Sequence, residues 1–313
     1  MSRALLSLPL LLLVACERGP FEAAVSPIDY PSADRVSARL SASNASRSFT
    51  FTTIEVPDAT STTASGINAR GDIVGSYLDA SGRSHGFLLD RGGFTTIDQP
   101  AAASTDARGI GPNGEIVGTY RLPGEPAVNF HGYLRSSAGV IVPAEFPGHT
   151  NTIAQRLLPD GTILGCRHDN DLMATMRGVA MSKRGNDEID AFASMHNGAT
   201  PNRRRIVGLY TNMDVTPNRQ EGYVIDDGVF APLLVPGSLT TAAWDVNPAG
   251  EIVGVYRDAA GFHGFVLTAD GYVPLNFPGA TATRAFGINA RGDIVGSYVA
   301  GGRTVGFVAR RDR

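Results

Sequence analysis

Six residues that could bind a ligand stand at comparable points in otherwise similar stretches of this 313-residue chain. They are Asp106, Arg108, Gln155, Trp244, Arg284 and Phe286. Aromatic faces beside arginine forks and a carboxylate can hold a sugar ring, a peptide or an anionic group. Trp244 is the only tryptophan of the chain. We therefore expect a binding site at these positions; the alternative is that the side chains only fill spaces between structural units.

Carboxylates raise a second possibility, which is a metal site. Asp106 and Asp245 are the only carboxylates of the predicted innermost strands that can be aligned between repeats. Asp169 and Asp171 lie close together in the stretch RHDNDLM, which we interpret as an extended loop. Calcium prefers such oxygen ligands, although the glycine and the final glutamate of a calcium-binding loop are missing here. These four residues are weak candidate metal ligands. No cofactor is expected, with calcium as the alternative.

Histidines and cysteines add no catalytic motif. His85, His131 and His263 recur at one place, each before a glycine and an aromatic residue, which favours a structural role. The chain contains no nucleophile elbow, HExxH, phosphate loop or CxxC sequence. Cys166 lies in an apolar strand-like stretch, which predicts a buried and unreactive thiol. No catalytic residue is therefore predicted.

The candidate residues belong to a repeat that fills the chain from residue 50 onward. GINARGDIVGSY occurs at 66–77 and again at 287–298, and DIVG-like sequences recur about every 44 residues between them. They are found at 72–75, 115–118, 162–165, 205–208, 251–254 and 293–296. The sequence therefore contains six repeats.

Each repeat predicts four short antiparallel strands. In the first repeat these are TASGIN, DIVGSY, HGFLL and GFTTID, at 63–68, 72–77, 85–89 and 93–98. Tight turns such as Asn68–Gly71 join the strands, with asparagine opening and glycine closing the turn. A longer, proline-containing stretch then leads to the next repeat. Six four-stranded antiparallel units joined by such crossings indicate an all-β, six-bladed β-propeller.

The ring is expected to close through its first strand. The GFTTID-type strand ends each repeat, but the last repeat stops at GFVARR without one, and a spare copy, FTTIEV, lies at Phe51–Val56. We predict that Phe51–Val56 supplies the outermost strand of the last blade, beside Val305–Arg310. This pairing would remove two open sheet edges.

Comparison of the repeats places the six candidate residues. Alanine recurs at Ala64, Ala107, Ala154, Ala243 and Ala285, whereas the positions of Thr63 and Ser65 vary freely from repeat to repeat. Asp106 and Arg284 take the place of Thr63. Arg108, Gln155, Trp244 and Phe286 take the place of Ser65. These positions begin the innermost strands, so we expect their side chains at the mouth of the central channel.

The phrases FTTIDQP, GINARGDIVGSY and SHGFLL closely resemble the HAF-type extracellular repeat family of bacteria. The resemblance covers residues 50–313, is strong in repeats one, two, five and six, and fades in three and four. It implies an exported, propeller-like protein. It brings no agreed reaction and no catalytic residues, so it supports the fold more than the function.

The amino terminus predicts export. Residues 1–15 contain Arg3 and an apolar run from Ala4 to Ala15, which is typical of a signal peptide and too short to span a membrane. Leu13–Cys16 resembles the bacterial lipobox, which implies cleavage before Cys16 and lipidation of Cys16. Residues 16–49 then form a predicted flexible tether. Residue 17 is Glu17 and not the aspartate that favours inner-membrane retention in enterobacterial lipoproteins. We therefore expect a monomeric outer-membrane lipoprotein on the periplasmic or the cell-surface side.

Composition and charge exclude one class of partner and leave several functions open. Formal net charge is −3 at pH 7, so the basic surplus of a nucleic-acid-binding protein is missing. The first hypothesis is a non-enzymatic binding or scaffold protein of the cell envelope, with a carbohydrate, peptide or envelope-protein ligand. The second is a metal-dependent hydrolase that resembles six-bladed lactonases, with its site at the channel mouth. The third is adhesion through the outer blade faces.

Overall fold

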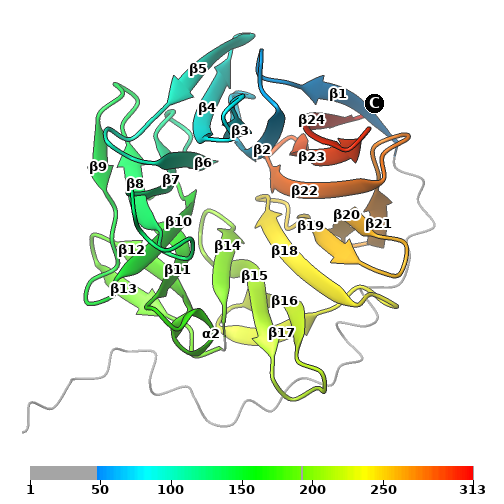
Figure 1. Cartoon of the computed structure of the whole chain (residues 1–313). Coiled ribbons are helices and arrows are strands. Elements are labelled where there is room, and N and C mark those ends of the chain that lie inside the picture. Colours follow the sequence, from blue (N-terminus) through cyan, green and yellow to red (C-terminus); the bar gives the residue numbers. More distant parts are fainter. Residues whose placement is uncertain (1–47, 192, 313) are drawn as a thin grey trace, which may run out of the picture. The chain divides into compact units, whose positions relative to one another are not determined.

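The computed structural model describes residues 48–191 and 193–312. The predicted signal peptide at 1–15, Cys16 and nearly all of the predicted tether at 16–49 lie outside these residues. The described chain forms six four-stranded antiparallel sheets arranged in a ring, which is a six-bladed β-propeller, as predicted (Figure 1). Strand order within five of the sheets follows the sequence, so each of these blades is a simple meander.

Strand bounds agree closely with the predicted repeat. Blades 1 to 3 contain β2 (Ser61–Ile67), β3 (Ile73–Leu78), β4 (Ser84–Asp90), β5 (Gly93–Ile97), β6 (Ser104–Ile110), β7 (Ile116–Arg121), β8 (His131–Arg135), β9 (Ile141–Pro143), β10 (Asn151–Leu157), β11 (Ile163–His168), β12 (Arg177–Ser182) and β13 (Gly185–Glu188). Blades 4 to 6 contain β14 (Met195–Ala199), β15 (Arg205–Asn212), β16 (Arg219–Asp226), β17 (Val229–Leu233), β18 (Thr240–Val246), β19 (Ile252–Arg257), β20 (Phe262–Thr268), β21 (Gly271–Leu275), β22 (Ala282–Ile288), β23 (Ile294–Ala300), β24 (Arg303–Arg311) and β1 (Phe49–Ile54).

The predicted ring closure is present. β1 is the outermost strand of the last blade and pairs antiparallel with β24, with Phe51 opposite Ala309 and Ile54 opposite Gly306. Figure 1 shows this first strand, in blue, beside the last strand, in red. β1 begins at Phe49, one residue before the predicted domain boundary. The first and last strands of the domain are therefore hydrogen-bonded to each other.

Asparagine organises the turn after the innermost strand. The Asn68 Oδ1 atom accepts hydrogen bonds from the backbone N–H groups of Arg70, Gly71 and Asp72, at 3.0–3.1 Å. Gly71 has a φ of +95°, a conformation that glycine adopts without strain. Asn289 forms the same turn in blade 6, where its Nδ2 also donates to the backbone oxygen of Asn68 in blade 1. The asparagine thus shapes its own turn and links neighbouring blades.

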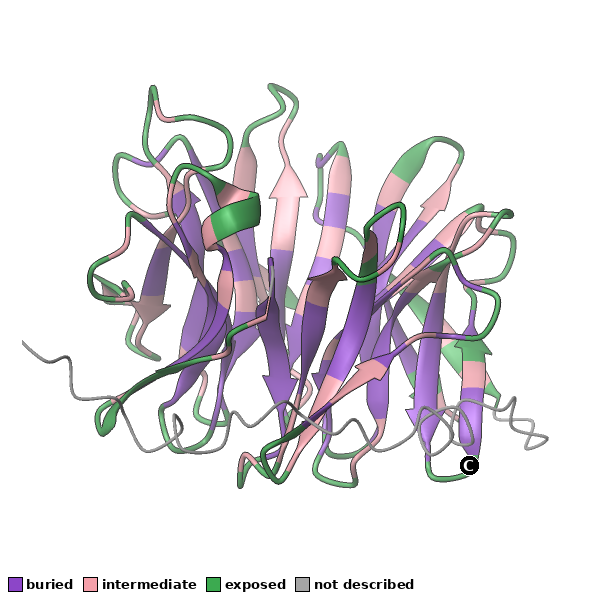
Figure 2. Cartoon of the chain, turned by 90° about the horizontal axis from the view of Figure 1, so that it is seen from below, coloured by how far each residue is buried: buried purple, intermediate pink, exposed green. Residues whose placement is uncertain are grey.

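The hydrophobic core lies between successive blades. Ile54, Val295 and Val308 of blade 6 form one buried cluster with Ala64 and Phe87 of blade 1. Because a blade packs against two neighbours, its central strands are apolar on both faces, as Figure 2 shows by the buried middle of the strands and the exposed loops at both rims. The DIVG glycine is part of this packing: a Cβ on Gly75 would lie 1.9 Å from the Thr63 oxygen and 2.8 Å from the Phe87 ring.

One local expectation was wrong. The RHDNDLM stretch was expected to be an extended loop, but it contains a short helix, α2 (Leu172–Thr175). Asp171 is its N-cap and accepts a hydrogen bond from the Ala174 N–H at 3.1 Å. The aspartate therefore begins a helical turn, which is a common role for this residue type.

Candidate functional site

A β-bulge in each innermost strand positions the candidate residues. In blade 1, Ala64 pairs with Gly75 and Gly66 pairs with Val74, so Ser65 is the extra, unpaired residue. The other five inner strands show the same register shift, and their extra residues are Arg108, Gln155, Asn197, Trp244 and Phe286. A bulge redirects the side chain of its extra residue without changing the rest of the ladder. The repeat therefore offers six variable positions on one constant frame.

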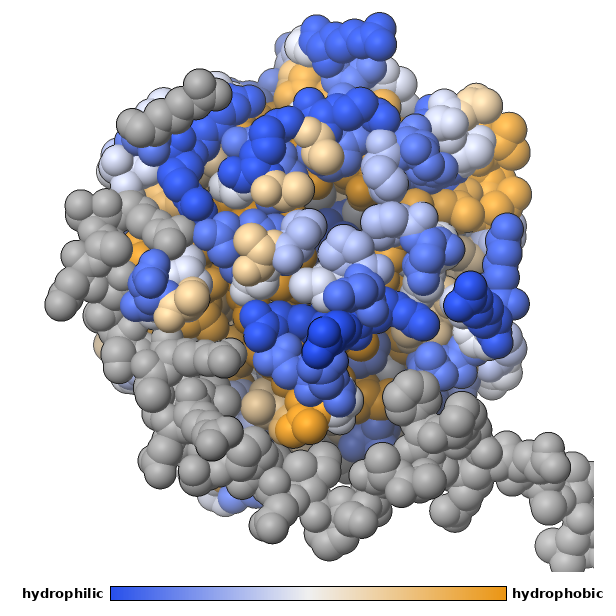
Figure 3. All heavy atoms as spheres, turned by 180° about the vertical axis from the view of Figure 1, so that it is seen from behind, coloured by the Kyte–Doolittle hydropathy of each residue, from blue (hydrophilic) through white to orange (hydrophobic). Residues whose placement is uncertain are grey.

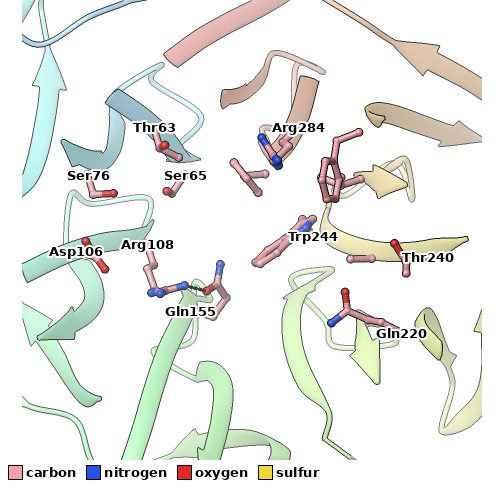
Figure 4. Close-up of a pocket in the computed structure, with 14 residues that line it drawn as sticks. Thr63, Ser65, Ser76, Asp106, Arg108, Gln155, Gln220, Thr240, Trp244 and Arg284 are labelled. Carbon is pink, nitrogen blue, oxygen red and sulfur yellow. Dashed lines mark hydrogen bonds between the residues drawn. The ribbon is translucent and has the colours of Figure 1, made fainter. Parts of the chain in front are cut away.

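Five of the six bulge residues line a pocket of about 370 Å³ at the mouth of the ring, whereas Asn197 is fully buried. All six residues expected at the mouth line it. Figure 4 shows the side chains of Arg108, Gln155 and Trp244 extending toward its open centre. The remaining polar and aromatic lining residues, which sequence comparison did not single out for the site, are Thr63, Ser65, Ser76, Gln220, Thr240 and Phe262. Gln220 and Phe262 begin the third strands of blades 4 and 5, so only the folded blade brings them to the mouth.

One side of the pocket is aromatic. The rings of Trp244 and Phe286 meet edge to face, with 5.1 Å between centroids and 89° between planes. Both side chains are half-buried, so part of each ring remains open to the pocket. Such a surface can pack against the apolar face of a ring-shaped ligand while the indole N–H remains available as a donor.

Two arginines bring positive charge to the same pocket. Arg108 donates from Nη1 to Gln155 Oε1 at 3.1 Å, drawn in Figure 4, and from Nε to Thr119 Oγ1 at 3.2 Å. The Arg284 guanidinium lies over the Phe262 ring, 4.4 Å from its centroid. Within residues 48–191 and 193–312, Arg284 has no hydrogen-bond acceptor and no acidic partner. Burial lowers the pKa of Arg284, so the protein does not compensate this charge well.

Asp106 gives the pocket its acidic group. Its Oδ1 atom accepts a hydrogen bond of 2.5 Å from the Ser84 hydroxyl of the same blade. No ion pair between Asp106 and either pocket arginine is present in the described part of the chain. The formal charge of Asp106, Arg108 and Arg284 together is therefore +1.

A buried ion pair lies one residue further along the inner strands. Arg156 Nη2 is 3.4 Å from Asp245 Oδ2, and both side chains are only 8% exposed. Arg156 also donates to the backbone oxygens of Phe286, at 2.9 Å, and Asn197, at 3.4 Å. Its Nη1 lies 3.1 Å from where a Cβ on Gly66 would be. Arg156 thus contacts residues of four other blades.

Asp245 is committed to this pair rather than to the pocket. Its two carboxylate oxygens accept hydrogen bonds from the N–H groups of Val246 and Ile288, at 2.9 and 3.0 Å. Burial raises the pKa of Asp245, and Arg156 and the two amides oppose this effect. Arg156 and Asp245 both directly follow the extra residue of the bulge. In the other four blades this position is a glycine, namely Gly66, Gly109, Gly198 and Gly287. Comparison of the repeats therefore shows Arg156 and Asp245 as two charged exceptions to a glycine, and the fold shows that they pair.

The candidate metal ligands do not fit a calcium ion. Asp106 lines the pocket whereas Asp245 faces Arg156, and Asp171 caps α2. Asp169 accepts from the Thr150 N–H and hydroxyl and contacts His149 Nδ1 at 2.9 Å, which together lower its pKa to about 2. The described residues hold no group of three or more His, Cys, Asp or Glu side chains suited to a metal ion.

The three recurring histidines make the same kinds of contact in their blades. His85, His131 and His263 each stack on a tyrosine of the adjacent strand, with centroids 4.9–5.1 Å apart. Each also contacts an acidic side chain of the nearby turn, Asp79, Glu125 or Asp258. Cys166 is buried, and burial raises the pKa of its thiol to about 12, so the thiol stays protonated at neutral pH.

A second hollow, of about 550 Å³, lies at the other end of the strands, between turns of blades 4 and 5. Its charged residues are already paired: Arg204 with Asp227 at 2.7 Å and Arg205 with Asp226 at 2.6 Å. The face of the molecule seen from behind is mainly hydrophilic (Figure 3). The mouth pocket is the better candidate because its arginines are not neutralised by partners.

Comparisons with known proteins identify the fold alone. No protein-family model matches the chain, and no curated protein matches it in sequence. Among solved structures, TolB from Acinetobacter baumannii is similar over 68% of this chain at 15% identity, with a TM-score of 0.50; the match spans about half, 54%, of that protein. An acylaminoacyl peptidase of Pyrococcus horikoshii matches 82% of this chain and 45% of its own, at 10% identity and a TM-score of 0.52.

A lectin of Aleuria aurantia is similar over 81% of this chain and 95% of its own, at 10% identity and a TM-score of 0.50. These three proteins have different names and functions, and the shared feature is the propeller. The likeness therefore supports the architecture and assigns no function to this chain.

Proposed function

We propose that this chain is a non-enzymatic ligand-binding protein of the bacterial cell envelope, a member of the HAF-type repeat proteins, anchored by lipid at Cys16. The observation that carries the proposal is the mouth pocket. A scaffold with nearly constant alanine and glycine positions presents Arg108, Trp244 and Phe286 on equivalent bulges around one cavity. Variable side chains on a rigid frame are the arrangement expected of a recognition site.

The chemistry of the pocket favours binding of a saccharide. Aromatic surface from Trp244 and Phe286 lies beside hydroxyl and amide groups, and these supply the apolar packing and the directed hydrogen bonds that a sugar requires. The Aleuria aurantia lectin, which has a similar fold, was solved in complex with Fucα1-6GlcNAc. That complex is consistent with a saccharide site on a propeller, but it assigns no sugar to this chain.

Lipid anchoring is part of the proposal. It rests on the apolar leader and the lipobox-like Leu13–Cys16, which lie outside the described residues. In the part of the chain that the structure describes, no helix has the length and apolar character needed to cross a membrane. Labelling with radioactive palmitate in a bacterial host tests the anchor: wild type should incorporate label and Cys16→Ser should not. Equal labelling of the two would contradict it.

The binding proposal is tested with the single tryptophan as the reporter. Because Trp244 is the only tryptophan and lines the pocket, saturable quenching or a spectral shift on titration reports on the pocket itself. We expect a saccharide from a panel of neutral and acidic oligosaccharides to give this signal and to show the same affinity by calorimetry.

Variants then locate the site. Trp244→Ala should weaken binding by calorimetry at least 10-fold, whereas Phe94→Ala, which changes an aromatic residue of the outermost strand of blade 1, should not. No saturable binding of any saccharide, or equal binding by wild type and Trp244→Ala, would overturn the proposal.

A further inference from the structure

The half-buried Arg284 makes an anionic ligand the best match for the mouth pocket. One face of its guanidinium is covered by the Phe262 ring at 4.4 Å. The N–H donors of a guanidinium lie in its plane, so this stacking leaves them available. No acceptor reaches them within the described residues, and desolvation of an unpaired charge is costly. A ligand oxygen with negative charge would satisfy donors that the protein leaves open.

The charge balance of the pocket favours a carboxylate over a doubly charged group. Asp106 lines the same cavity, and Arg108 already donates to Gln155 and Thr119. The net formal charge of these three ionisable residues is +1. A carboxylate carries one negative charge, and its two oxygens match the fork of a guanidinium. A phosphate dianion would exceed the available positive charge and would be repelled by Asp106.

Four hydroxyl groups around the cavity match the remainder of such a ligand. The side chains of Thr63, Ser65, Ser76 and Thr240 line the pocket, and none of them makes a hydrogen bond within residues 48–191 and 193–312. Figure 4 shows Thr63, Ser65 and Ser76 on the blade 1 side and Trp244 on the opposite side. Hydroxyls can both donate and accept, as the hydroxyls of a sugar do. The pocket therefore combines an anion donor, an aromatic face and a polar wall.

We infer that the natural ligand is an acidic saccharide that contains a uronic acid, with the carboxylate bound by Arg284 and a sugar ring against Trp244. This inference rests on the proposed function and adds the chemical class of the ligand. Arg108 and Gln155, which are hydrogen-bonded to each other, lie on blades 2 and 3 across the pocket from these two groups.

The test compares hexuronate oligosaccharides with their methyl esters, which have the same rings but no charge. Tryptophan fluorescence and calorimetry on the full chain should give affinities about 10- to 100-fold higher for an acid than for its ester, the range expected for one charge-assisted pair. Arg284→Gln should bring acid and ester to the same affinity. Arg284→Lys should keep part of the preference, because charge remains but the fork is lost.

Arg204→Gln is the matched control, since Arg204 is an exposed arginine in a turn at the other end of the strands. It should leave both affinities unchanged. Equal binding of acid and ester, tighter binding of a sulfated or phosphorylated saccharide, or a preference that survives in Arg284→Gln would overturn the inference while the binding proposal stands. If neither charged nor neutral saccharides bind, both proposals fail.

Discussion

Arg156 of blade 3 and Asp245 of blade 5 face each other near the axis of the ring, with 3.4 Å between Nη2 and Oδ2. Four other blades carry glycine at this position, and the two exceptions occur together with opposite charges. Burial of one charge alone would be strongly unfavourable, but the pair and its backbone hydrogen bonds compensate each other. The two residues hold non-adjacent blades in contact beneath the binding pocket.

Removing one member of this pair should destabilise the domain. Arg156→Met leaves the Asp245 carboxylate buried without its cation, and we expect the free energy of unfolding to fall by about 3–5 kcal/mol. Urea denaturation of Arg156→Met, Asp245→Asn and the double variant gives the coupling, which should be about 1–3 kcal/mol. Arg204→Met breaks a solvent-exposed pair and should therefore destabilise the domain far less. Similar losses for the two methionine variants would contradict this prediction.

Acid should destabilise the domain through His196. This residue is buried, and burial lowers its pKa from 6.5 to about 4. The unfolded chain therefore binds a proton more readily, so the contribution is complete above pH 6.5 and is lost as the pH falls toward 4, by at most about 3 kcal/mol. His196→Ala should flatten the dependence of unfolding free energy on pH in this window. Alanine fits the fold, because Ala107 occupies the same place in blade 2. An unchanged slope in the variant would show that His196 is not responsible.

His131 should act in the opposite direction. Burial lowers the pKa of His131, but hydrogen bonds and charges from Glu125 and Glu145 outweigh this effect, so the net shift is upward. Its contribution is present below pH 6.5 and disappears as the pH rises through the folded pKa. His131→Gln should lower the free energy of unfolding at pH 6 by less than about 1 kcal/mol, because the group is partly solvated, and should have a smaller effect at pH 9. An effect that grows with pH would refute this assignment.

The first strand should contribute to the stability of the whole ring. Ile54 is 4% exposed and packs with residues of blades 6 and 1. Ile54→Ala should lower the free energy of unfolding by about 2–5 kcal/mol in a single cooperative transition. Thr52→Ala, an exposed site in the same strand, should change it by no more than about 0.5 kcal/mol. A separate early transition limited to blade 6 would argue that the ring does not unfold as one unit.

Deletion of residues 48–57 extends this test. It leaves β24 without its outer partner and exposes Phe307, which Phe51 now covers with 5.4 Å between ring centroids. We expect loss of the cooperative transition. A synthetic peptide of residues 48–57 added in excess should restore part of the stability, by binding only the folded ring. Full stability of the truncated chain would contradict the proposed role of β1.

The sequence predicted the fold well because the repeat is local. Turn residues such as Asn68 and Gly71, together with the apolar strands around Gly75, contain nearly all the information that defines a blade. The mouth was predictable at Trp244 and Phe286 for the same reason, since comparison of repeats exposes variable positions. Gln220 and Phe262 were missed because they begin third strands, and their approach to the bulges depends on how the blade twists.

The Arg156–Asp245 pair and the helix of blade 3 show a second limit of prediction from the repeats. No repeat-based comparison assigns a partner to Asp245, because the partner lies two blades away along the ring. Asp245 could therefore be interpreted as a free carboxylate near the channel. Geometry decides this point: both of its oxygens are occupied by amides, and Arg156 balances its charge.

The pairing of β1 with β24 also sets an order for synthesis. Blades 1 to 5 consist of contiguous sequence and can form as the chain emerges, but blade 6 needs residues from both ends of the domain. Joining partners this far apart in sequence carries a large loop-closure cost and is expected to be slow. Until Arg303–Arg311 is released, β1 has no partner and remains an unprotected strand. Without β24, blade 6 therefore retains only the pair β22–β23, and β1 keeps an unpaired edge that can associate with another strand.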